Sequence, residues 1–119
     1  MEIFNDIDLN DSYVLGWRRT VNSLAFEIEA SIWPNSIFYS EPKPNEYTCY
    51  KNATLWFKEV KSIEGLKSMA EATSTKDPDG TIDYGNIDDL SKTESGYMLW
   101  GDFGDVQLVG GEIGFEIHT

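Results

Sequence analysis

The chain has 119 residues, 40% of them hydrophobic and 13% aromatic, so it can bury a core and is expected to fold as one domain over residues 1–119. Its 21 acidic and 9 basic side chains give a formal net charge of −12. This charge disfavours nucleic acid and anionic membranes as direct partners, because both are bound through clustered Lys and Arg. A basic protein or a divalent cation fits better, and solubility alone is the alternative explanation.

The first half of the chain contains two segments in which apolar and polar residues alternate. Residues 12–20 place Tyr13, Leu15 and Trp17 at every second position, and residues 24–32 place five apolar side chains on one face. A period of two is typical of a half-buried strand. We therefore predict two antiparallel strands joined by a short turn.

The middle of the chain is expected to hold a loop, a strand and a helix. Residues 35–46 contain two prolines and read as a loop, whereas residues 47–60 carry aromatic and β-branched side chains on both faces, as a covered strand does. From Ser62 to Thr73 the apolar residues recur at helical spacing, and Ser62 can cap the first turn. We predict one short helix there, closing one end of the sheet.

The C-terminal quarter predicts a three-strand meander. Residues 97–100 form the first strand, and residues 106–108 and 113–117 alternate apolar with polar side chains. The pair Gly110-Gly111 between the last two can adopt the positive φ of a tight hairpin turn.

These segments together predict an all-β or β-rich α+β fold. We expect an antiparallel sandwich or partly open barrel of about seven strands with one short helix. The expected core comprises the apolar residues of the inward-facing positions: Leu24, Phe26, Ile28, Leu55, Phe57, Val106, Leu108, Ile113 and Phe115.

The inventory of reactive side chains argues against an enzyme. His118 is the only histidine and lies at the terminus, and Cys49 is the only cysteine, so no intrachain disulfide is possible. No phosphate-binding loop, nucleophile elbow or metal cluster is present, and we expect no cofactor and no metal. Neither a signal peptide nor an apolar run of about 20 residues is found, so we expect a cytoplasmic protein without a membrane segment.

Two alternative functions remain open. Trp33 and Trp56 either belong to the core or form an exposed platform for a sugar or a protein partner, and Glu27 and Glu29 are paired carboxylates on one strand face. Alternatively, acidic residues between positions 75 and 86 have part of the spacing of a calcium-binding loop, although the first and twelfth positions lack the expected acids. The first alternative is a carbohydrate-binding or carbohydrate-processing sandwich, and the second is a calcium-stabilised structural module.

Four short stretches carry a resemblance to known proteins: residues 11–12, 50–57, 84–88 and 100–104. Together they resemble small acidic β-rich bacterial proteins, which include the immunity proteins of polymorphic-toxin systems and uncharacterised relatives. The resemblance implies a non-enzymatic binding protein whose acidic surface masks a basic toxin. It implies no catalytic residue.

The expected binding surface follows from where the acidic side chains gather. If the acidic group at positions 77–89 meets Asp102 and Asp105 at one end of the sheet, a negative patch results, in which desolvated aromatic anchors supply the affinity. The partner-binding residues that we predict are Asp83, Tyr84, Asp88, Asp89, Trp100, Asp102, Phe103 and Asp105.

Overall fold

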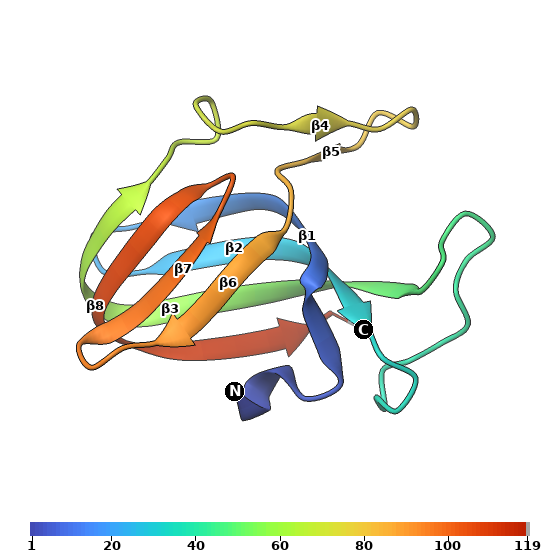
Figure 1. Cartoon of the computed structure of the whole chain (residues 1–119), viewed down its shortest axis with the longest axis horizontal. Helices are drawn as coiled ribbons and strands as arrows, with labels where there is room; N and C mark the ends of the chain where they lie inside the picture. The colour runs from blue at the N-terminus through green and yellow to red at the C-terminus, as the bar shows by residue number, and fades with distance from the viewer. Residues whose placement is uncertain (119) are drawn as a thin grey trace.

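The computed structural model describes residues 1–118, and most of them lie in antiparallel strands. Six strands form one sheet in the order β1–β2–β3–β8–β7–β6, which curls into a half-barrel (Figure 1). They are β1 (Ile7–Arg19), β2 (Leu24–Ile32), β3 (Cys49–Leu66), β6 (Ile87–Lys92), β7 (Gly96–Gly101) and β8 (Gly104–Ile117). The short strands β4 (Thr75–Lys76) and β5 (Ile82–Asp83) form a separate hairpin, and a 3-10 turn, η1 (Glu2–Phe4), precedes β1. The predicted antiparallel, partly open β fold is confirmed.

The two edges of the curled sheet approach each other at the start of β6. The Val14 amide donates to the Gly85 carbonyl, and the Tyr84 amide donates to the Val14 carbonyl, both at 2.8 Å. The side-chain amide of Asn86 donates to the Ser12 carbonyl at 2.8 Å. These bonds tie β1 to the chain entering β6, so the half-barrel is partly closed on that side. Within the described residues, no helix is long and apolar enough to span a membrane.

The core lies inside the curl and receives side chains from all six strands of the sheet. Phe26, Phe57 and Phe103 are its largest fully buried residues. On β1, Val14 and Trp17 face the core, because a register shift between Val14 and Gly16 reverses the alternation. The prediction that Tyr13, Leu15 and Trp17 share one face is therefore wrong.

Seven of the nine predicted core residues are buried, and the two exceptions lie on β8. Ile113 and Phe115 are half-buried and pack against the margin of the core. Beyond Val109, β8 pairs with β3 alone, because β7 begins at Gly96, which lies opposite Val109. The only described aromatic neighbour of Phe115 is Phe4 of η1, whose ring centroid lies 5.3 Å away.

The helix predicted over residues 62–73 is wrong. β3 continues to Leu66, because Ser62 and Ile63 pair with Val109 and Leu108 of β8. Tertiary strand pairing overrides the local helical spacing here. The capping pattern does appear at Ser68, whose side chain exchanges hydrogen bonds with Glu71, but only a single turn follows.

The hairpin turn predicted at Gly110-Gly111 is also wrong, because β8 runs through both residues as one strand. Their φ values are +71° and +97°, and the register of β8 on β3 shifts beside them, after Val60. The two glycines thus bend a continuous strand around the barrel, where a positive φ would strain any other residue.

Candidate functional site

The structure places three of the eight predicted partner-binding residues side by side on the outer face of β6, β7 and β8, and two more at the margins of this group. Asp89 pairs with Trp100, and Trp100 pairs with Asp105 on the next strand. Side chains directly opposite each other in a sheet share a face, with Cβ atoms about 5 Å apart. Trp100, which is 44% exposed, therefore lies between two exposed carboxylates.

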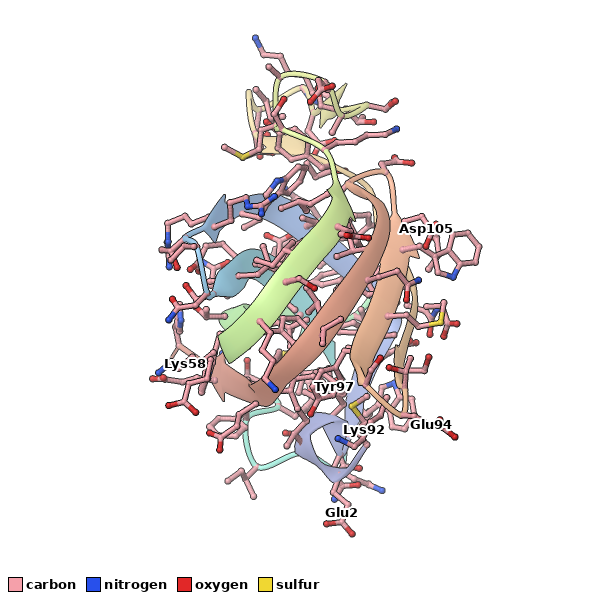
Figure 2. The ribbon with its side chains drawn as sticks, turned by 90° about the vertical axis from the view of Figure 1, so that its left-hand side faces the viewer. Glu2, Lys58, Lys92, Glu94, Tyr97 and Asp105 are labelled. Atoms are coloured by element: carbon pink, nitrogen blue, oxygen red, sulfur yellow. The ribbon has the colours of Figure 1, made fainter. Side chains whose placement is uncertain are left out.

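Asp88 and Asp102 extend this row at its two margins. The Asp88 carbonyl accepts a hydrogen bond of 3.0 Å from the Asn10 side chain, which places Asp88 where β6 meets β1. Asp102 is exposed in the β7–β8 turn, with its carboxylate against Gly85. We call this set the Trp100 patch: Asp88, Asp89, Trp100, Asp102 and Asp105. Figure 2 shows Asp105 toward the end of the molecule that carries the β4–β5 hairpin, and Glu94 toward the opposite end.

The other three predicted residues lie elsewhere. Phe103 is fully buried, with its ring 4.9 Å from that of Phe26, so its assignment as a partner anchor is wrong. It occupies the turn before β8, where the chain directs the ring into the core. Tyr84 is half-buried and packs edge-on against Trp17 at 5.1 Å. Asp83 belongs to β5, and its carboxylate accepts a 3.0 Å hydrogen bond from the Gly85 amide.

The residues of the carbohydrate alternative do not form one platform. Trp33 follows the end of β2, level with the start of β3, whereas Trp56 lies seven residues along β3. At about 3.3 Å per residue the two rings are separated by roughly 20 Å of strand. Glu27 is occupied by an ion pair of 3.3 Å to Arg18 and a 3.0 Å hydrogen bond from the Thr54 hydroxyl.

The acidic loop at positions 75–86 forms a compact turn closed by its own side chains. The Thr81 hydroxyl lies 2.7 Å from the Asp79 carboxylate and 3.2 Å from that of Asp77. Across residues 1–118, no three His, Cys, Asp or Glu side chains are placed to hold a metal ion together. The ligand set that a calcium loop requires is not assembled here.

Sequence reasoning missed a cavity of about 560 Å³ on the outer face of β1, β2 and β3. Tyr13 and Tyr50 line it with ring centroids 5.8 Å apart, and Tyr47 lies 5.9 Å from Tyr50. The Tyr50 hydroxyl donates to that of Tyr47 at 2.8 Å, and Tyr47 donates to Asp11. Asp11 also accepts a 3.0 Å hydrogen bond from Ser31, so one carboxylate anchors the tyrosine cluster to β1 and β2. The only sequence signal was the density of tyrosines near positions 47–50.

No protein-family model matches this chain, and neither the curated proteins nor the solved structures give a significant match.

Proposed function

We propose that this protein is a non-enzymatic binding protein that engages a basic partner protein through the Trp100 patch. One observation carries the proposal: an exposed tryptophan is set between carboxylates from the strands on either side of it. Tryptophan is among the residues that contribute most to protein interfaces, because its ring buries a large apolar area.

The carboxylates and the tryptophan have separate tasks in this proposal. The negative field of Asp88, Asp89, Asp102 and Asp105 attracts a cationic surface and raises the association rate, up to about 10⁸–10⁹ M⁻¹s⁻¹ at low salt. The Trp100 ring then supplies affinity once water has left the contact, and this affects mainly the dissociation rate.

The immunity-protein resemblance supports a toxin as the partner. A basic toxin satisfies both that resemblance and the net charge of −12. Binding of this kind needs no catalytic group, because an inhibitor acts by covering the surface that the toxin uses.

Affinity capture with three immobilised baits tests the proposal: the wild type, Trp100→Ala, and Asp88→Lys with Asp89→Lys. A charge-matched control, Glu2→Lys with Glu94→Lys, makes the same change in net charge at the end of the molecule away from Asp105 (Figure 2). We expect a basic protein that is retained by the wild type and the control, and lost from both patch variants. Equal retention by all four baits would contradict the assignment of this surface.

Association kinetics with the purified partner then separate the two tasks. Raising salt from about 50 to 500 mM should slow association steeply for the wild type, because the screening length of exposed charges falls from about 10 Å at 0.1 M salt toward about 3 Å at 1 M. Trp100→Ala should keep this salt dependence and dissociate faster. An association rate that is indifferent to salt would exclude charge steering.

A further inference from the structure

The tyrosine-lined cavity lies on the outer face of the other half of the sheet and comes nearest the Trp100 patch at Gly85, which contacts both Asp83 and Asp102. Its floor is formed by β1, β2 and β3, and its sides by the 33–48 loop and the β4–β5 hairpin. Both segments extend past the end of the sheet at which β2 finishes and β3 begins (Figure 1). Its volume of about 560 Å³ lies within the range of small-ligand sites, about 300–1,000 Å³.

The cavity wall combines neutral aromatic rings with ionisable acids. Burial raises the pKa of Tyr50 well above its ordinary value, and the hydrogen bond to Asp11 raises that of Tyr47. Both phenols therefore stay protonated at physiological pH and present uncharged rings. Five carboxylic acids also belong to the lining: Glu29, Glu46, Asp77, Asp79 and Asp83.

Glu29, at the floor, shows that these acids repel one another. Burial is the main cause that raises its pKa, and the neighbouring charges of Glu46, Asp77 and Asp83 raise it further. Lys43 is the one cation that acts in the opposite direction. A cation in the cavity would relieve this repulsion.

The spread of the acids identifies the kind of cation. A bare metal ion requires several ligands at one point, and the described residues offer no such group of three. Carboxylates distributed around a cavity suit a larger cation that carries more than one hydrogen-bond donor. Tyrosine rings attract ammonium and guanidinium groups through their π faces.

We infer that this cavity binds an organic cation that presents alkylammonium or guanidinium groups. Its source is either a free polyamine or the side chains of a basic protein segment, which share this chemistry. The inference is independent of the Trp100 patch and of the partner proposed for it.

Isothermal titration at about 150 mM salt tests the site with spermidine, with the peptide acetyl-Arg-Gly-Arg-amide, and with its Gln analogue. We expect at least one of the two cations to bind at a single site and the neutral peptide to show no heat. Tighter binding of spermidine identifies a free polyamine as the source, and tighter binding of the Arg peptide identifies protein side chains.

Matched variants locate the binding. Glu29→Gln and Tyr47→Ala should each weaken it by about tenfold, which corresponds to the loss of one good ionic or cation–π contact. Asp105→Asn removes the same charge as Glu29→Gln but lies in the Trp100 patch, and it should change the affinity less than about twofold. The inference is overturned by equal weakening in the Glu29 and Asp105 variants, by absence of binding of both cations at millimolar concentration, or by calcium binding as tightly as either.

Discussion

Two phenylalanine truncations test the account of the core, because Phe26 and Phe115 have the same side chain in different surroundings. Phe26 is fully buried, and its ring lies 4.9 Å from Phe103 and 6.1 Å from Trp17. Phe115 is half-buried on the part of β8 that lacks a second neighbouring strand.

Phe26→Ala should lower the free energy of unfolding by about 3–5 kcal/mol, the usual loss for a buried phenylalanine. Phe115→Ala removes a ring that already contacts water over part of its surface, so we expect a loss of about 1–2 kcal/mol, scaled from the same principle. For a chain of this size each kcal/mol corresponds to a fall in Tm of about 3–5 °C.

Urea denaturation followed by far-UV circular dichroism measures both losses without depending on the fluorescence of the nearby Trp17. The m-value should stay unchanged, so that the shift in midpoint reports stability alone. Losses that agree within about 0.5 kcal/mol, or a larger loss for Phe115, would show that the open side of β8 has been misassigned.

Three further predictions use the same equilibrium measurement. Ser12→Ala should lower the free energy of unfolding by about 1–3 kcal/mol, because the buried Ser12 hydroxyl accepts a 2.9 Å hydrogen bond from the Ser31 amide and the variant leaves that amide unpaired. Ser12→Thr keeps a hydroxyl and serves as the comparison. The pKa of Glu29 is raised in the folded state, so its contribution to stability is fully present below about pH 4.5 and is lost as pH rises through the folded pKa. Glu29→Gln should therefore raise Tm at pH 7 and not at pH 4. An unchanged Tm at pH 7 would contradict the repulsion between acids in the cavity. Gly114→Ala should displace the Trp56 ring that covers this glycine and shift tryptophan emission, whereas an unchanged spectrum and Tm would show that the ring does not pack there.

The sequence predicted the strands in which apolar and polar residues strictly alternate and those that pair with their neighbours in the chain. β2 follows the alternation from Leu24 to Ile32, and most of the Trp100 patch was predictable because β6, β7 and β8 are consecutive in the chain. The β1 bulge was not predictable, because its register shift depends on the partner strand. β3 beyond Ser62 illustrates the same limit: its residues fit a helix locally and a strand once β8 lies beside them.

The cavity was harder to predict, because its walls come from distant parts of the chain. Tyr13, Glu29 and Asp83 converge only after the sheet has curled and the β4–β5 hairpin has folded beside it. Each residue alone has an ordinary explanation, as a strand or turn residue facing water. Only the folded chain brings these residues close enough together to line one cavity.

The second half of β8 also bears on whether two copies of this chain can pair edge to edge. From Gly110 to Ile117 the strand pairs with β3 alone within the described part of the chain, so its other border offers backbone groups to any extended segment. Glu112 and Glu116 alternate with the apolar residues along this border. A second copy pairing antiparallel about Gly114 would set Glu112 opposite Glu116 twice, and like charges directly opposite destabilise a pair of strands. We therefore expect the two glutamates to disfavour extension of the sheet by a second copy at this border, and neutralising both by acid or by mutation should remove that effect.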